Sequence, residues 1–226
     1  MRDVLKRGIL RLSARARAGR GRMFRRLLQP TAQDKILDLG GYDGSHIASV
    51  LPGYQNIWVA DINAEGLERA ASRYGFHTAL LREGEPLPFA DHEFDIVFCS
   101  SVIEHVTIPK SEVYLCQSGR EFKRRAFASQ QAFAAEVRRV GKRYFVQTPY
   151  KYFMIESHTW MPMPVIFLPR PWLIRLLRFS NRRWIKATDP DWNLLTFGDM
   201  GRLFPDAHIM IEWWMGLPKS IIAYRR

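Results

Sequence analysis

From Lys35 onward, the chain alternates short apolar runs with amphipathic stretches, and this alternation constrains its fold more than any other feature. Short continuous apolar runs are typical of buried strands, whereas apolar residues three and four apart indicate helices. Strands that alternate with helices form a parallel sheet with helices on both faces. The sequence therefore predicts an α/β fold with three layers.

The predicted elements follow one another regularly along the chain. Strands are expected over residues 35–39, 56–60, 77–81, 94–99, 143–147, 208–214 and 220–224, and helices over residues 44–51, 64–74, 122–140 and 197–204. The last two strands are separated by a turn over residues 216–218 and can form a hairpin. We therefore expect a mostly parallel sheet of seven strands that ends in an antiparallel C-terminal hairpin.

One region interrupts this regular pattern. Residues 149–171 contain five of the 13 prolines, and residues 160–192 contain four of the seven tryptophans. A chain of 226 residues is long enough for one domain with an elaboration. The sequence thus predicts a basic N-terminal arm over residues 1–28 and a single domain over residues 29–226, with an aromatic, proline-rich insertion at about 150–195.

The net charge of +12 is concentrated in the arm, because residues 1–26 carry ten basic side chains and one acid. The rest of the chain is nearly neutral. A basic segment with interspersed apolar residues could lie on an anionic membrane surface or on RNA. A solvated terminal helix and a mitochondrial transit peptide are the other interpretations of the arm.

The sequence also bears on location. The strongly apolar stretch over residues 161–169 contains two prolines and is far shorter than the roughly 20 residues that cross a bilayer. The N-terminus lacks the apolar segment of an export signal. Cys99 and Cys116 form no CxxC pair, and reduced thiols suit a cytosolic compartment. We expect a cytoplasmic protein whose arm can make a peripheral contact with a membrane surface.

The first predicted strand ends in Asp38 and runs into a turn from Gly40 to Gly44 that opens a helix. Such a turn places backbone N–H groups at the carboxyl end of the strand, where open α/β sheets bind ligands. Tyr42 and Asp43 occupy positions where a dinucleotide fingerprint needs glycine, which weakens an NAD interpretation.

This segment resembles the first motif of class I S-adenosylmethionine-dependent methyltransferases, an apolar strand with an acid followed by Gly-x-Gly-x-Gly. Asp38, Gly40 and Gly44 match the motif, and Tyr42 replaces its middle glycine. The resemblance implies a Rossmann-like methyltransferase fold, S-adenosylmethionine as the cofactor, and these three residues as part of its site. It covers residues 33–148 firmly and residues 196–224 more loosely.

Two later segments extend the resemblance. The second strand ends in Asp61 and Ile62, where the family binds the ribose hydroxyls and packs against adenine; a plain helix cap is the alternative role of Asp61. The segment from Glu83 and Gly84 through Leu-Pro-Phe to Phe-Asp-Ile-Val is similar to the family's third motif. Glu83 then stands where a carboxylate meets the adenine amino group.

The fourth strand leads into Cys99, Ser100 and a Glu-His pair that ends at His105. In the resembling family, the start of this stretch faces the methionine part of the cofactor, which makes Cys99 and Ser100 candidate backbone contacts. His105 is a candidate general base, and a role in orienting a loop is its alternative.

A Glu-x-His-Thr stretch after the fifth strand places Glu156 and His158 near the expected acceptor position. His158 is the second candidate base, and a polar pair that fixes a proline-rich lid is the alternative. The six histidines show no metal-ligand spacing, so no metal is expected.

The sequence therefore predicts a methyltransferase whose acceptor is a small molecule, a glycan or a lipid-linked compound. An RNA methyltransferase is the enzymatic alternative, although the neutral body disfavours nucleic acid. A cofactor-binding domain without catalysis is the third, since Tyr42 interrupts the glycine motif.

Overall fold

A computed structural model describes residues 17–154, 158–183 and 186–226. Residues 1–16 of the predicted arm and Glu156 lie outside the described residues, so the expectations placed on them stay predictions. Within the described chain, no helix is long and apolar enough to cross a membrane.

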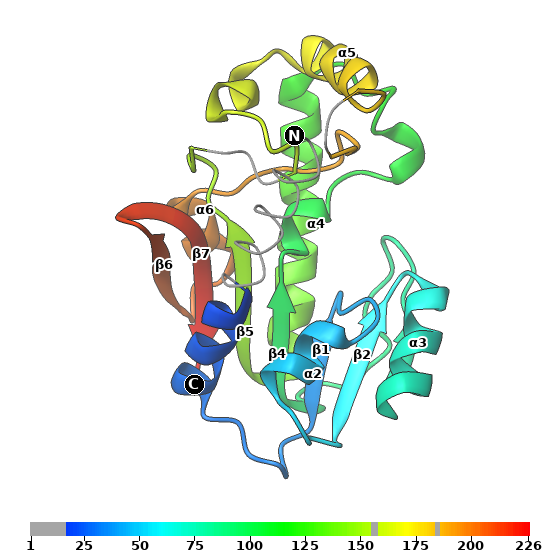
Figure 1. The fold of residues 1–226 in the computed structure, drawn as a ribbon, viewed down its shortest axis with the longest axis vertical. Helices are drawn as coiled ribbons and strands as arrows, with labels where there is room; N and C mark the ends of the chain where they lie inside the picture. The colour runs from blue at the N-terminus through cyan, green and yellow to red at the C-terminus, as the bar shows by residue number, and fades with distance from the viewer. Residues whose placement is uncertain (1–16, 155–157, 184–185) are drawn as a thin grey trace. The chain divides into compact units, whose positions relative to one another are not determined.

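Within the described residues, seven strands form a sheet in the order β3-β2-β1-β4-β5-β7-β6 (Figure 1). β1 pairs in parallel with β2 and β4, and β2 pairs in parallel with β3. The C-terminal strands run antiparallel. The predicted mostly parallel seven-stranded sheet is therefore confirmed. The strands are β1 (Ile36–Leu39), β2 (Ile57–Asp61), β3 (His77–Leu80), β4 (Phe94–Ser100), β5 (Gly141–Pro149), β6 (His208–Trp214) and β7 (Leu217–Arg225).

The helices begin and end where local chemistry favours it. The Asn63 side chain accepts a hydrogen bond from the Gly66 N–H at the start of α3, and Gly75 ends that helix in the left-handed conformation. Thr196 and Asp199 form a capping box at the start of α6. The labelled helices are α2 (Ser45–Val50), α3 (Ala64–Tyr74), α4 (Gly119–Val140), α5 (Arg170–Ser180) and α6 (Phe197–Leu203), and residues 17–28 are also helical.

Contacts divide the chain into two compact units. Of the described residues, the first unit comprises 17–100, 136–146 and 224–226, and the second comprises those within 101–135 and 147–223. β5 and α4 each continue from one unit into the other. The strands β3, β2, β1 and β4 belong wholly to the first unit, and β6 belongs wholly to the second.

The helical residues 17–28 pack against the sheet of the first unit. The ring of Phe24 lies 4.8 Å from that of Phe98 and 5.6 Å from that of Phe145, and all three are fully buried. Burying one such side chain stabilises a fold by roughly 1.5–3 kcal/mol. This part of the predicted arm thus belongs to the folded body, because its apolar residues face the sheet.

In the second unit, the insertion contains a helix that the sequence analysis missed. α5 packs Leu173 and Leu177 against Trp192, and Pro171 occupies its first turn, where proline is tolerated. Arg170 donates from Nε to the Cys116 carbonyl and lies 3.5 Å from the Phe122 ring centroid. A proline in this region can therefore stand in the first turn of a helix, as Pro171 does, and does not always mark irregular structure.

Candidate functional site

The register of the parallel strands brings three predicted site residues to one edge of the first unit. Asp38 of β1 pairs with Val59 of β2 and with Phe98 of β4. Asp61 and Ser100 lie two residues further along those strands, at the level of the glycine-containing loop over residues 40–44. The carboxyl ends of β1, β2 and β4 therefore surround this loop, as expected for a ligand site in an open sheet.

The carboxylate of Asp61 is fixed by two backbone N–H groups. The N–H of Tyr42 donates to Oδ2 at 2.9 Å, and the N–H of Asn63 donates to Oδ1 at 2.9 Å. A carboxylate oxygen can accept two hydrogen bonds, so each oxygen keeps one acceptor position. Asp61 is also distinct from the cap of α3, which is Asn63. The two backbone N–H groups therefore orient the Asp61 carboxylate and still leave one acceptor position on each oxygen.

Tyr42, which replaces the middle glycine, has a left-handed backbone with a φ of 51°. Its ring lies against Gly66 of α3, where an added Cβ would come within 2.8 Å of the Tyr42 Cδ2 atom. Its hydroxyl accepts a hydrogen bond from Arg69. The side chain thus lies along α3. Gly40 and Gly44 keep the positive φ angles, 75° and 68°, that favour glycine.

Asp38 is buried at the end of β1, with 3% of its surface exposed. Within the described residues, its buried Oδ2 atom has no hydrogen-bond partner. Burial, together with the charges of Asp61 and Asp43, raises the pKa of Asp38 to about 8. An added Cβ on Gly41 would lie 2.3 Å from this oxygen, so Gly41 is required by close approach. The sequence analysis had not singled out Gly41.

The residues predicted to meet the adenine lie at the surface of the first unit. Ile62 follows β2 and is 50% exposed, which is unusual for a large apolar side chain next to a buried strand. Glu83 and Gly84 belong to an exposed turn after β3, and Gly84 has a φ of 78°. Their roles stay predictions.

At the end of β4, Cys99 is buried and Ser100 is partly exposed. Arg20, from the helical residues 17–28, donates from Nη1 to the Ser100 Oγ at 3.4 Å and is only 9% exposed. From the sequence alone, Arg20 is one of the ten basic residues of the predicted arm. The signal that could have found it is its place four residues before Phe24, on the helix face that packs inward.

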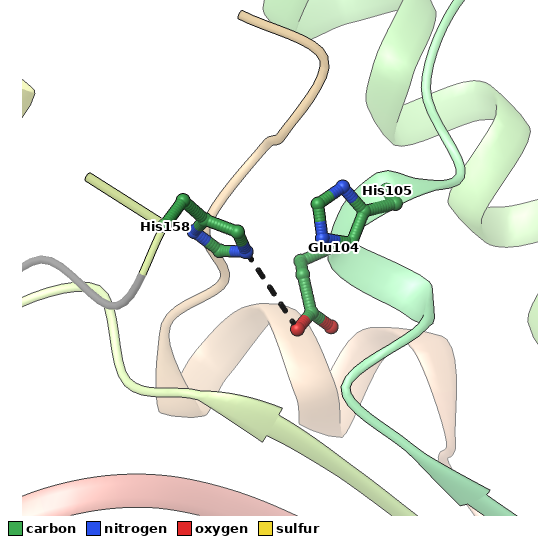
Figure 2. Close-up of side chains that lie close together, drawn as sticks. All are labelled: Glu104, His105 and His158. Atoms are coloured by element: carbon green, nitrogen blue, oxygen red, sulfur yellow. Dashed lines mark ion pairs between the residues drawn. The ribbon is translucent and has the colours of Figure 1, made fainter. Parts of the chain in front are cut away.

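The second unit brings together the two predicted catalytic histidines. The ring centroids of His105 and His158 lie 4.7 Å apart, and Figure 2 shows both rings beside Glu104. The His158 Nε2 atom lies 3.9 Å from the Glu104 Oε1 atom. Glu104 is fully buried and accepts a hydrogen bond at Oε2 from the Thr148 hydroxyl at 3.0 Å. Residues far apart in the chain therefore form one polar cluster.

Asp191 supports this cluster from the insertion. Its Oδ1 atom lies 3.3 Å from the His105 Nδ1 atom, and its Oδ2 atom lies 3.3 Å from the Lys110 Nζ atom. Burial lowers the pKa of His105, but the hydrogen bond to Asp191 and the charge of Glu104 outweigh it, and the pKa is raised. Burial likewise opposes ionisation of Asp191, but His105 and Lys110 keep its pKa below the usual value.

The predicted residues thus fall into two groups. The first unit holds the nine residues predicted to bind the cofactor, and it places Asp38, Asp61 and the glycine loop together. The second unit holds His105 and His158 beside Glu104.

Comparison with known proteins agrees with this arrangement. A family model described as a methyltransferase domain matches residues 37–143. The fold is shared with the PH0226 protein from Pyrococcus horikoshii OT3, at 13% identity over 90% of this chain and 86% of that chain, with a TM-score of 0.53. No curated protein matches the chain at a significant level.

Two further solved structures share the fold. The trans-methyltransferase CalH in complex with S-adenosylhomocysteine is 13% identical over 89% of this chain and 53% of that chain, with a TM-score of 0.52. The N-terminal domain of EvdMO1 with S-adenosylhomocysteine bound is 16% identical over 93% of this chain and 80% of that chain, with a TM-score of 0.50.

The parallel sheet, its glycine loop and the acids at its strand ends define a Rossmann-like methyltransferase fold. The match over residues 37–143 and the shared fold are consistent with the predicted class I S-adenosylmethionine-dependent methyltransferase family. The predicted resemblance is confirmed, and with it S-adenosylmethionine as the cofactor.

Proposed function

We propose that this protein transfers a methyl group from S-adenosylmethionine to a small-molecule, glycan or lipid-linked acceptor. The observation that carries the proposal is the carboxylate of Asp61, which two backbone N–H groups orient at the carboxyl end of β2. A carboxylate with open acceptor positions is suited to the two ribose hydroxyls of the cofactor.

The surrounding residues fit the other parts of the cofactor. The exposed side chain of Ile62 offers an apolar surface for adenine, and Glu83 and Gly84 form the turn assigned to its amino group. Arg20 presents a guanidinium beside Ser100, which suits the carboxylate of the methionine part. The buried carboxyl of Asp38 lies near the loop and suits a cationic ligand.

When bound, S-adenosylmethionine supplies a methyl group on a sulfonium, which is already a good leaving group. The protein's task is then alignment and exclusion of water, and positioning alone can contribute roughly 7–11 kcal/mol. Asp61, Arg20 and the glycine loop would provide this alignment. A base role for His105 and His158 stays a prediction, and the proposed function does not depend on it.

Exposed aromatic side chains support an apolar or sugar acceptor. In the insertion of the second unit, Phe167 is 64% exposed, Trp172 60% and Phe179 61%. The ring centroids of Tyr152 and Phe167 lie 6.5 Å apart in a stacked arrangement. Exposed aromatic rings are common where proteins bind apolar or planar ligand surfaces.

A basic groove in the first unit supports an anionic lipid surface as the partner of the N-terminal region. The groove has a volume of about 510 Å³, lies between the helical residues 17–25 and α2, and is lined by Arg17, Arg22, Arg25, Ser45 and Ser49 among others. Arginine is suited to phosphate because its guanidinium donates several hydrogen bonds. The full chain should therefore float with vesicles that contain phosphatidylglycerol and not with pure phosphatidylcholine vesicles.

Replacing Arg17 and Arg22 with alanine should weaken this vesicle binding, whereas replacing the exposed Arg202 of the second unit should not. If RNA of random sequence binds the chain tightly and the double variant loses that binding while vesicles never bind, the RNA methyltransferase alternative replaces the lipid-linked one.

Isothermal titration with S-adenosylmethionine tests the cofactor assignment. We expect Asp61→Ala to weaken binding by about 1–3 kcal/mol, because the ribose hydroxyls lose a charged acceptor. Glu68→Gln removes an exposed carboxylate from α3 and is the matched control. Equal affinity of the two variants would refute the role of Asp61.

Turnover separates an enzyme from a cofactor-binding domain without catalysis. Cells that lack the protein should accumulate a metabolite one CH₂ unit lighter than its counterpart in the parent cells. The purified chain should methylate that metabolite and release S-adenosylhomocysteine. A chain that binds the cofactor but methylates no fraction of the deletion extract would support the non-catalytic alternative.

A further inference from the structure

Glu104 carries a buried carboxylate with only one of its oxygens satisfied. Oε2 accepts the hydrogen bond from Thr148, whereas Oε1, within the described residues, has no hydrogen-bond partner. Glu104 has no exposed surface, so water from the bulk does not compensate this oxygen. Leaving a buried charged acceptor unpaired is costly, which indicates that something else belongs at Oε1.

The spacing to His158 limits what that occupant can be. The 3.9 Å between the Glu104 Oε1 and His158 Nε2 atoms is too long for a direct hydrogen bond. Two metal–ligand bonds of about 2.0–2.1 Å at a tetrahedral angle place their ligand atoms about 3.4 Å apart. A single bound ion therefore fits between the two groups once they approach each other by about half an ångström.

His105 completes a set of three ligands. One ligand atom from each of Glu104, His105 and His158 can be chosen so that all lie within 4.8 Å of one another. The Nδ1 atom of His105 faces Asp191, which leaves Nε2 as the ligand atom. A carboxylate that accepts from the other ring nitrogen is the usual outer partner of a metal-bound histidine.

The ring of His158 is held in place by packing. It stacks on Trp192 with a centroid distance of 5.3 Å and an interplanar angle of 11°, and His158 is 6% exposed. A hydrogen bond from the Thr148 hydroxyl to the Oε2 atom likewise restrains the side chain of Glu104. A ligand set whose members are held by their surroundings needs little reorganisation on binding.

We propose that Glu104, His105 and His158 form a binding site for a divalent transition-metal ion, with Zn²⁺ as the expected occupant. Two imidazoles and one carboxylate are a ligand set that such ions prefer. Three protein ligands leave a fourth position open for water or another oxygen ligand. The site does not depend on the proposed methyl transfer. The sequence predicts no metal because its six histidines show no metal-ligand spacing, and residues 105 and 158 come together only in the folded chain.

Titration of the untagged full chain with Co²⁺ tests the site, because the visible absorption of this ion reports its ligands. One equivalent should bind with the absorption of a low-coordinate nitrogen and oxygen site and without a thiolate band, and Zn²⁺ should displace it. Glu104→Gln and His158→Gln should each weaken binding at least 100-fold. Asp191→Asn should weaken it by about 10–100-fold, as expected for an outer partner.

His208→Gln is the matched control, since His208 is an exposed histidine of β6 outside the cluster. It should bind Co²⁺ as the unmodified chain does. Circular dichroism of every variant checks that loss of binding is not loss of folding; a variant that fails to fold is replaced by His105→Gln. Absence of stoichiometric binding, or binding that survives both ligand substitutions, would overturn the proposal and leave a bridging water between Glu104 and His158.

Discussion

The two units of this protein place polar residues in different ways. In the first unit, Asp38 and Asp61 stand at the ends of neighbouring parallel strands, and the motif that contains each is continuous in the sequence. In the second unit, Glu104 meets Thr148 and His158 from separate segments. A site at a sheet edge can thus be recognised from short motifs, whereas a site built from loops is visible only after folding.

The units also differ in how their buried charges are balanced. Among the residues that the structure describes, the Asp38 Oδ2 atom has no hydrogen-bond partner and the pKa of Asp38 is raised, whereas Asp191 pairs with His105 and Lys110 and has a lowered pKa. An uncompensated carboxyl in the first unit is consistent with a ligand that brings positive charge. The pairing of Asp191 stabilises its ionised form without a ligand, which distinguishes it from Glu104 of the same unit, whose Oε1 atom has no hydrogen-bond partner within the described residues.

The largest effect that we predict concerns Asp38 of the first unit and the dependence of protein stability on pH. Asp38 has a pKa of about 8 in the folded protein against 3.8 ordinarily, so the folded state holds a proton that the unfolded state loses. The free energy of unfolding should therefore fall as the pH rises from about 4 to about 8. The slope is about 1.4 kcal/mol per pH unit at most.

Asp38→Asn removes this titration and should flatten the profile over the same range. Urea unfolding at a series of pH values measures the slope for both chains. Parallel profiles for the two chains would show that Asp38 is not the group that titrates.

Arg170→Ala should cause the next largest effect, a loss of stability that is limited to the second unit. The guanidinium donates to the carbonyls of Cys116, Val113 and Pro190, and its loss leaves these acceptors buried and unpaired. We expect a loss of about 1–3 kcal/mol of stability for each buried carbonyl that is left without a donor. At a temperature where the variant is folded, its affinity for S-adenosylmethionine should be unchanged; a tenfold loss would contradict the assignment of cofactor binding to the first unit.

Gly41→Ala should affect both stability and cofactor binding in the first unit. The added Cβ would lie 2.3 Å from the Asp38 Oδ2 atom, so the loop or the carboxyl must move. Overpacking of this kind costs about 1–3 kcal/mol. Gly198→Ala in α6 is the control, because nothing lies within 4 Å of its added Cβ. Thermal unfolding compares the two, and equal midpoints would contradict the close approach.

Tyr42→Gly should give the smallest effect. Glycine relieves the left-handed backbone at this position but removes the ring that packs against Gly66 and Arg69. These changes oppose each other, so we expect stability to change by less than about 1 kcal/mol and cofactor affinity to change by less than about threefold. A gain of tenfold or more in affinity would show that the ring occupies part of the cofactor site.

Much of the sheet and of its helices could be predicted because their signals are local. Residues 64–74 and 208–214 have the predicted bounds, since capping residues or a clear apolar pattern mark both ends. The strand predicted over residues 143–147 extends over Gly141–Pro149, and β7 begins at Leu217 within the predicted turn. Pairing with neighbouring strands lengthens an element beyond what its own residues indicate.

The rest could not be predicted because it depends on contacts between distant residues. Asp191 contacts His105 from 86 positions away in the chain, and no motif or spacing in the sequence predicts this contact. α5 was missed because its prolines resemble loop residues unless they are known to occupy a first helical turn. Arg20 was counted with the arm because net charge does not distinguish buried from solvated arginines.

The contact between Tyr42 and Gly66 links two positions that are 24 residues apart in the chain. A Cβ on residue 66 would lie 2.8 Å from the Tyr42 Cδ2 atom and 3.1 Å from the Tyr42 carbonyl carbon, so it would crowd both the ring and the backbone of residue 42. A smaller residue at position 42 relieves only the contact with the ring. An aligned set of relatives should therefore keep glycine at residue 66 wherever residue 42 carries a large side chain.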